Sequence, residues 1–315
     1  RTAAQQHACA TKRIGWLIMP VEIMPPKGSS HDLFYNCCCC KVGNERDTDW
    51  CGKLADENTK SISLQPMMMM HATAEDSVHP TSIKMQDDAL VERDEVVVDS
   101  GALYKGQWKG NKRHGTGTYR RHDGQVFTGQ FVNDLAHGEG KCTSLTGNEY
   151  IGQWIQDKAH GEGTYKHCDG SVYKGQWRMD HKHGRGVETW ADDARYEGEF
   201  VFGVKHGYGQ YQSARGVTYA GQFTQDRMHG EGQYKFCDGR TYTGQWDQSR
   251  MHGIGMMVWS DGASYEGSFE RDLKHGFGTF TWSDGRSYSG QWSQGKQHGE
   301  GTTVDEDGVK MRTLW

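Results

Sequence analysis

Aromatic and glycine positions recur along this chain at a fixed interval of 23 residues, nine times without a change of register. Each copy opens with an alternating run, aromatic-x-Gly-x-aromatic, and has His-Gly-x-Gly beginning ten residues after the opening aromatic. The opening aromatics are Tyr104, Phe127, Tyr150, Tyr173, Tyr196, Tyr219, Tyr242, Tyr265 and Tyr288. A fixed period of roughly 20 to 50 residues is typical of a repeat array, whose units build an extended surface.

The copy that begins at Tyr173 has the pattern of one β-hairpin. Tyr173, Gly175 and Trp177 alternate with polar residues, which is the period of a strand with one apolar face. The polar residues that follow, through His183-Gly184, predict the hairpin loop, and a second strand is predicted from Gly186 onwards.

Asp-Gly pairs separate most of the copies, with the aspartates at positions 123, 169, 238, 261, 284 and 307. Between two alternating runs, Asp-Gly predicts a type I′ turn, in which both central residues have positive φ. Thr146-Gly147, Asp192-Asp193 and Arg215-Gly216 replace the pair in other copies and leave the turn geometry open there.

The repeats predict an all-β fold. A two-stranded hairpin is marginal alone, so neighbouring copies are expected to pair edge to edge. Residues 101–315 are therefore predicted to form an elongated single-layer antiparallel sheet of about nine stacked 23-residue β-hairpins. At about 4.8 Å per strand, it would extend roughly 85 Å. Residues 1–100 are predicted to be a low-complexity, largely disordered region, in which Asp87 to Asp99 form a helix or strand that caps the first copy.

The repeat phase continues to the last residue. Met311, Thr313 and Trp315 fall on the opening-aromatic, glycine and tryptophan positions of a degenerate tenth copy. The sequence also begins at Arg1 instead of methionine. It therefore reads as a fragment at its N-terminus, and the interrupted copy allows the same at its C-terminus.

The unit resembles the MORN (membrane occupation and recognition nexus) repeat, which reads roughly Tyr-x-Gly-x-Trp-x-x-Gly-x-x-x-Gly-x-Gly. The copy from Tyr104 reads Tyr-Lys-Gly-Gln-Trp-Lys-Gly-Asn-Lys-Arg-His-Gly-Thr-Gly, and the copies from Tyr242 and Tyr288 fit as well. The departures are Phe127 for tyrosine, and Phe131, Phe200, Phe223 and Phe269 for tryptophan. The resemblance covers residues 101–315. It implies a twisted sheet with a concave aromatic groove, and a role in scaffolding, protein binding or membrane association near cilia, cell cortex or membrane junctions.

The charge balance limits the classes of partner that the array is expected to bind. Residues 101–315 carry 26 of the 36 Lys and Arg and 26 of the 41 Asp and Glu, so the array is neutral. Nucleic acids require a concentrated basic face and are excluded as partners. The same neutrality weakens electrostatic attraction to an anionic membrane. No apolar run approaches the ~18 residues of a membrane-spanning helix.

One histidine in each copy, from His114 to His298, raises the question of a metal site. Successive copies would lie about 10 Å apart along the sheet, whereas zinc needs its ligands about 2.1 Å from one ion. A structural role in the hairpin loop is therefore predicted, with no metal and no cofactor. The sequence also contains no nucleophile-base arrangement and no nucleotide-binding loop, so no catalytic residues and no enzymatic activity are predicted.

The aromatic side chains are expected to form the core of the array. A single-layer sheet cannot cover both of its faces, so some rings are also expected to line a groove that binds a peptide or a helix. The candidate groove residues are Tyr104, Trp108, Tyr150, Trp154, Tyr173, Trp177, Tyr196, Tyr219, Tyr242, Trp246, Trp259, Tyr265, Trp282, Tyr288 and Trp292. Four copies carry a further aromatic near the end of the unit, at Trp190, Phe236, Trp259 and Trp282.

Four consecutive cysteines, Cys37, Cys38, Cys39 and Cys40, follow an apolar stretch in the N-terminal region. S-acylation at two or more of them would anchor the chain firmly to a membrane. The alternatives are an unmodified tract, and zinc or redox chemistry at the Cys37 and Cys40 pair. The other cysteines show no disulfide framework, which favours a reducing, cytoplasmic setting.

Together these features favour a non-enzymatic, cytoplasmic scaffold that binds a protein partner along the groove. Membrane association, at the cell cortex or a cilium and with the cytoskeleton, is part of this expectation. One alternative is the regulatory MORN region of a phosphatidylinositol phosphate kinase, or of a SET methyltransferase, whose catalytic domain follows Trp315. A second alternative is direct phospholipid binding. The exposed edges of the sheet also allow a homodimer.

Overall fold

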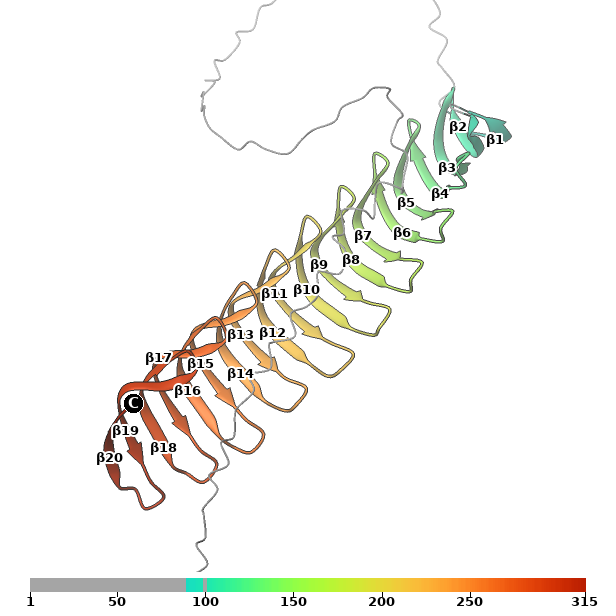
Figure 1. The fold of residues 1–315 in the computed structure, drawn as a ribbon. Coiled ribbons are helices and arrows are strands. Elements are labelled where there is room, and N and C mark those ends of the chain that lie inside the picture. The colour runs from blue at the N-terminus through green and yellow to red at the C-terminus, as the bar shows by residue number, and fades with distance from the viewer. Residues whose placement is uncertain (1–88, 99–100) are drawn as a thin grey trace, which may run out of the picture.

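The structure, a computed structural model, describes residues 89–98 and 101–315. These residues form one open sheet of 20 strands, in which each strand pairs antiparallel with the next along the chain (Figure 1). The predicted all-β, single-layer antiparallel sheet is therefore confirmed. No helix in the described part of the chain has the length and hydropathy needed to cross a membrane.

The strands are β1 (Val91–Val97), β2 (Leu103–Lys109), β3 (Lys112–Arg120), β4 (Val126–Val132), β5 (Leu135–Thr143), β6 (Glu149–Ile155), β7 (Lys158–Lys166), β8 (Val172–Arg178), β9 (His181–Thr189), β10 (Arg195–Val201), β11 (Val204–Gln212), β12 (Thr218–Thr224), β13 (Arg227–Lys235), β14 (Thr241–Asp247), β15 (Arg250–Val258), β16 (Ser264–Glu270), β17 (Leu273–Thr281), β18 (Ser287–Ser293), β19 (Lys296–Val304) and β20 (Lys310–Leu314). We number the copies from one, which opens at Tyr104, to nine, which opens at Tyr288. Each copy contributes an even-numbered strand followed by an odd-numbered one.

Both ends of the array carry an additional strand. At the N-terminal end β1 pairs with β2 from Val91 opposite Trp108 to Val97 opposite Leu103, so the predicted cap is confirmed as a strand. It lies before the predicted domain boundary at residue 100. At the C-terminal end β20 continues the repeat phase, with Met311 opposite Thr303. The predictions for residues 1–88, including those for Cys37 to Cys40, lie outside the described residues.

The predicted type I′ turn at the Asp-Gly pairs is wrong. At the pair that begins with Asp169, only Gly170 has positive φ (97°), and its N–H donates to His167 O at 3.0 Å. This is a type I turn followed by a glycine bulge. The Asp169 carboxylate stabilises it by accepting the N–H of Ser171 at 2.7 Å. At Asp192-Asp193, one of the three places where the pair is lost, Asp193 with φ of 64° takes the place of the glycine.

In copies two to nine, two residues with positive φ instead lie at the opposite end of the hairpin. Between β8 and β9 they are Met179 and Asp180, with φ of 50° and 70°. The predicted loop is therefore too long, because His183-Gly184 lies inside β9 at a β-bulge. Gly184 has φ of 57°, and a Cβ there would collide with the amide oxygen of Gln176, which accepts the N–H of Arg185 at 3.0 Å.

The core of the array is a continuous ladder of aromatic rings. Tyr173 meets Trp177 of its own copy and Phe200 of the next copy edge-on, with ring centroids 5.0 and 5.1 Å apart. The same two contacts recur along the array from Trp108 to Trp292. Each such pair contributes about 0.5–1.5 kcal/mol beyond its buried area. The tyrosine ring leaves no space for a side chain on the facing strand, because a Cβ on Gly186 would lie 2.6 Å from Tyr173 ring carbons.

Candidate functional site

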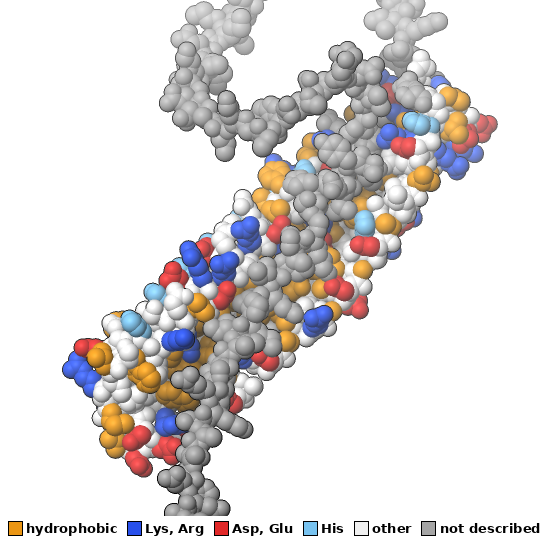
Figure 2. All heavy atoms as spheres, viewed as in Figure 1, with side chains coloured by type: hydrophobic (Ala, Val, Ile, Leu, Met, Phe, Trp, Pro, Cys, Tyr) orange, Lys and Arg blue, Asp and Glu red, His pale blue; other side chains and the backbone are white. Residues whose placement is uncertain are grey.

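The sheet has two chemically different faces. The aromatic face carries the ladder and three further positions of each copy, which we call the variable positions. They are the residue directly before the His-Gly pair, the residue that faces the opening aromatic on the second strand, and the residue two places after that one. The polar face carries the repeated histidines and the residue between the glycine and the second aromatic, which is glutamine in most copies. Figure 2 shows hydrophobic side chains gathered along the middle of the visible surface, with charged side chains of both signs towards its borders.

The structure brings most of the candidate groove residues together in the core. Thirteen of the fifteen, all except Trp259 and Trp282, are at most 6 % exposed. Burial raises the pKa of Tyr104 to about 12, and it also raises the pKa of the opening tyrosines of copies four to nine. These thirteen rings form a floor that is already packed, and Trp259 and Trp282 are the two that keep accessible surface. Contact of any of them with a partner stays a prediction.

A second layer of rings lies above this floor, and only part of it is evident from the sequence pattern. Tyr119, Trp190, Tyr211, Trp259 and Trp282 are partly buried and pack against the ladder. Two of them contact each other across neighbouring copies, with the Trp190 and Tyr211 centroids 6.1 Å apart. Each of the two tyrosines faces the opening aromatic of its own copy, where the alternation of the second strand could have revealed it.

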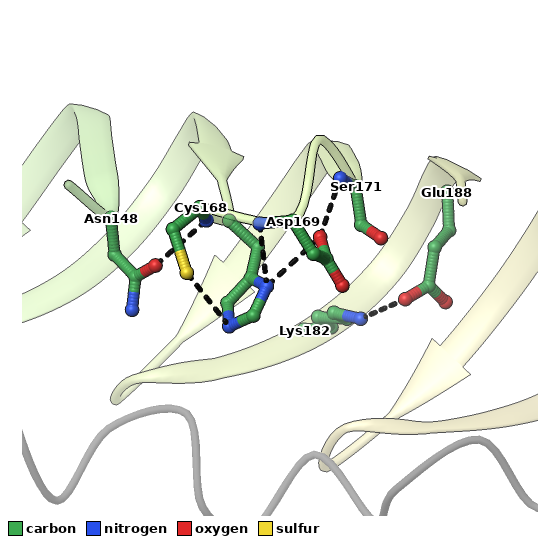
Figure 3. A network of polar contacts seen from close by, with 7 residues as sticks. Asn148, Cys168, Asp169, Ser171, Lys182 and Glu188 are labelled. Atoms are coloured by element: carbon green, nitrogen blue, oxygen red, sulfur yellow. Dashed lines mark hydrogen bonds and ion pairs between the residues drawn. The ribbon is translucent and has the colours of Figure 1, made fainter. Parts of the chain in front are cut away.

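Basic residues also lie on the aromatic face, directly before the His-Gly pair of four copies: Arg113, Lys182, Lys205 and Lys274. The ammonium of Lys182 lies 5.1 Å from the Tyr173 ring centroid and 2.6 Å from a carboxylate oxygen of Glu188 (Figure 3). Both side chains are well buried, at 6 % and 15 % exposed. The repeat pattern of aromatics and glycines does not mark these cations, although the register of the second strand places them on this face.

The nine copies, with their glycine bulges and their aromatic ladder, match one family over nearly the whole array. The family described as MORN repeat matches residues 104–126, 127–149, 150–172, 173–195, 196–218, 219–239, 242–264, 265–285 and 288–310. This chain belongs to the MORN-repeat proteins.

No curated protein matches the MORN-repeat chain. Among solved structures it is similar to the TCP10 domain of Danio rerio CPAP in complex with a STIL peptide, at 11 % identity and a TM-score of 0.35, covering 72 % of this chain and 100 % of that one. It is also similar to the TCP domain of Drosophila melanogaster SAS-4 in complex with a proline-rich motif of Ana2, at 10 % identity and a TM-score of 0.30, covering 56 % and 85 %. Virginiamycin B lyase from Staphylococcus aureus gives 9 % identity and a TM-score of 0.16, covering 73 % and 86 %. Likenesses this low do not bear on what the MORN array binds.

A polar network joins two neighbouring turns of the MORN array (Figure 3). The Cys168 N–H donates to the side-chain oxygen of Asn148 at 2.9 Å, and His167 Nδ1 lies 2.9 Å from Asp169 Oδ1. Thiol, imidazole and carboxylate are the groups of nucleophilic catalysis. However, Cys168 Sγ lies 4.0 Å from His167 Nε2, beyond the roughly 2.6–3.2 Å of an activating hydrogen bond. The Ser171 N–H, more than the imidazole, lowers the pKa of Asp169. The network therefore stabilises the two turns.

The repeated histidines lie on the polar face, where His160 and His183 line one shallow depression together with Gln153 and Gln176. Among residues 89–98 and 101–315, no three His, Cys, Asp or Glu side chains are placed to hold one metal ion. The expected loop position of these histidines is wrong, since they lie in strands at the bulge.

Proposed function

We propose that this MORN-repeat chain is a non-enzymatic scaffold that holds an elongated segment of a protein partner along its aromatic face. The observation that carries the proposal is the second layer of partly exposed rings above a closed core, including Trp190, Tyr211, Trp259 and Trp282. Tryptophan and tyrosine on such surfaces dominate binding energies between proteins. Equivalent positions recur about every 10 Å along the sheet, a spacing that suits an extended peptide or a helix.

Three of the four cations on the aromatic face are paired with carboxylates, which favours a protein partner over an anionic lipid. Arg113 pairs with Asp134 at 3.6 Å, and Lys205 pairs with Asp226 at 3.5 Å. Their positive charges are thus compensated within the array and offer little attraction to a phospholipid headgroup. S-acylation of the Cys37 to Cys40 cluster would add a membrane tether to the same cytoplasmic scaffold.

Site-specific cross-linking of the full chain in cells tests the proposal. A photoreactive phenylalanine analogue replaces Trp282 on the aromatic face or, as a matched control, Phe277 on the polar face, where that ring is 68 % exposed. We expect the first to cross-link a discrete protein whose recombinant segment then binds the purified chain. We expect the control to leave that protein unlinked. Equal cross-linking from both faces, or none from Trp282, would overturn the proposal.

Two further measurements separate the alternatives. Flotation of the purified chain with anionic liposomes, abolished by changes on the aromatic face, would favour direct phospholipid binding instead. A catalytic domain encoded directly after Trp315 in the transcript would favour a regulatory region of a kinase or methyltransferase.

A further inference from the structure

Lys274 differs from the other three cations of the aromatic face in its surroundings. Its ammonium lies 4.3 Å from the ring centroid of Trp292, 4.5 Å from Phe280, 5.3 Å from Tyr265 and 5.5 Å from Trp259. Rings from the residue directly after β15 and from strands β16, β17 and β18 thus surround one positive charge. We call these four rings and Lys274 the caged lysine.

The repeat explains why this lysine has no carboxylate partner. Asp226, which pairs with Lys205, stands in the turn of the following copy, and the equivalent position after Lys274 is Gly295. The backbone of that turn is unchanged, because Gly295 N–H donates to Lys274 O at 2.9 Å as Asp226 N–H does to Lys205 O at 3.1 Å. Only the side-chain carboxylate is missing.

The second way in which the array compensates a cation is missing as well. The copy of Lys182 also has glycine in the following turn, at Gly203, but there Glu188 supplies the carboxylate from six residues further along the same strand. Six residues after Lys274 stands Phe280, one of the cage rings. The described residues accordingly give Lys274 no ion pair, and burial lowers its pKa to about 8.

A lysine in such a cage carries a positive charge that still lacks a counter-ion. The faces of aromatic rings attract an ammonium group, but a desolvated charge without a counter-ion remains unfavourable. A carboxylate that approached from the open side would complete the pair while its apolar neighbours covered the rings. Two aspartates of the same copy are engaged elsewhere, since Asp284 pairs with Arg286 at 2.6 Å and Asp272 accepts the N–H of Met251 at 2.8 Å.

We propose that the caged lysine binds an aspartate or glutamate side chain of the partner segment, flanked on both sides by apolar residues. The partly exposed Trp259 lies in copy seven, one copy before Lys274, and Trp282 lies in the same copy as Lys274, directly after its strand; both contact Phe280, so the face offers apolar contacts on two sides of the cage. The bound chain continues in both directions past the carboxylate, which assigns an internal acidic side chain to the site in preference to a C-terminal carboxylate. This inference rests on the proposed function and fixes the position and charge of one anchor.

Two substitutions test the inference with little risk to the fold. K274M removes the charge. G295D restores the internal carboxylate at a turn position whose counterpart Asp226 has φ of 64°, close to the 78° of Gly295. As a reciprocal control, D226G leaves Lys205 without its carboxylate, as Gly295 leaves Lys274, and should create a second acid-binding position.

The full chain is used to select peptides from a display library of about twelve random residues, long enough to span roughly four copies. We expect wild type to select peptides with an acidic residue between apolar residues. Glutamine in place of that residue should weaken binding about tenfold. The same replacement should change binding less than about twofold in K274M and in G295D. Amine acetylation of the free chain across pH should show a lowered pKa for Lys274 that rises when the peptide binds.

The outcomes distinguish the two levels of the proposal. Peptides that bind the aromatic face without an acidic residue, or an ordinary lysine pKa in the free chain, would overturn the caged-lysine inference and leave the scaffold function intact. Selection of no peptide, or of peptides whose binding survives both W259A and W282A, would count against binding along the aromatic face and so against both.

Discussion

The first five copies of the array and the next three present different surfaces over the same core. At the position equivalent to Trp190, copies one to five carry Arg121, Ser144, His167, Trp190 and Ser213, whereas copies six to eight carry Phe236, Trp259 and Trp282. The cations differ in the same way. Lys182 and Lys205 have carboxylate partners in the first part, and Lys274 in the second part has a cage of rings. The ladder beneath them does not change.

This difference shows that the repeat separates its structural positions from its variable ones. Tyrosine, glycine and the second aromatic are fixed by contacts that every copy makes with the next. The variable positions have no part in the bulge or the glycine contacts, so their residues differ between copies and give each stretch of the aromatic face its own chemistry. A binding preference is therefore expected to reside in these positions.

The largest change in the free energy of unfolding is expected from breaking the buried ion pair between Lys182 and Glu188, in the first part of the array. In E188Q the buried Lys182 keeps its charge and loses its carboxylate, which should cost about 3 kcal/mol of the free energy of unfolding. Urea denaturation followed by tryptophan fluorescence measures the change. The double substitution K182M/E188L, which removes both charges, should recover most of the loss. If E188Q unfolds like wild type, the pair does not stabilise the array.

The shared core predicts equal effects in both parts. An added Cβ in G186A or G255A would meet a tyrosine ring, of Tyr173 or Tyr242, at 2.6 Å from Cζ, and each should cost about 2 kcal/mol. Thermal unfolding of the two variants should give the same loss within error. The control T243A, on the exposed polar face, should stay near wild type. A much smaller effect at one site would show that the ladder is not equivalent along the array.

The caged lysine predicts that the stability of the array depends on pH. The folded pKa of Lys274, about 8, lies below the 10.5 of a free lysine, so the folded chain binds fewer protons between these values. Stability should therefore rise with pH from about 8 to 10, by at most about 1.4 kcal/mol per pH unit, and K274M should abolish the rise. Above pH 10 the raised pKa values of the buried tyrosines reverse the trend, because only the unfolded chain ionises there. Denaturation midpoints of wild type and K274M, measured across this pH range, test the prediction. The same increase of stability with pH in K274M would contradict the assignment to Lys274.

The smallest change in stability is expected from giving Lys274 the carboxylate partner that the cations of the first part already have. G295D supplies the carboxylate that Lys205 already has, and should stabilise the array by about 1 kcal/mol at pH 7. Differential scanning calorimetry should show a higher midpoint for G295D than for wild type. The same substitution in the K274M background should lose the gain, and an equal gain there would show that the turn, not the pair, is responsible.

The sequence alone determined the architecture. The fixed period of alternating aromatics leaves only stacked hairpins, because each hairpin is too small to bury its rings without a neighbour. The acidic cap became β1, and Met311 continued the register of a tenth copy in β20, as the pattern predicts. The turns were assigned incorrectly because Asp-Gly is compatible with two geometries. The choice between them depends on a loop one residue longer, which the Asp169 side chain stabilises through its bond to Ser171.

Only the tertiary structure decided which rings and charges remain available. The sequence pattern makes both Tyr265 and Trp282 candidate groove residues, yet Tyr265 is fully buried and Trp282 is only partly buried. Within the described residues Lys274 lacks an ion pair because two positions that could supply a carboxylate do not: they are occupied by Gly295 and Phe280. Their significance appears only when strands of consecutive copies are placed side by side, because a buried charge is stabilised or left uncompensated by groups distant in the sequence.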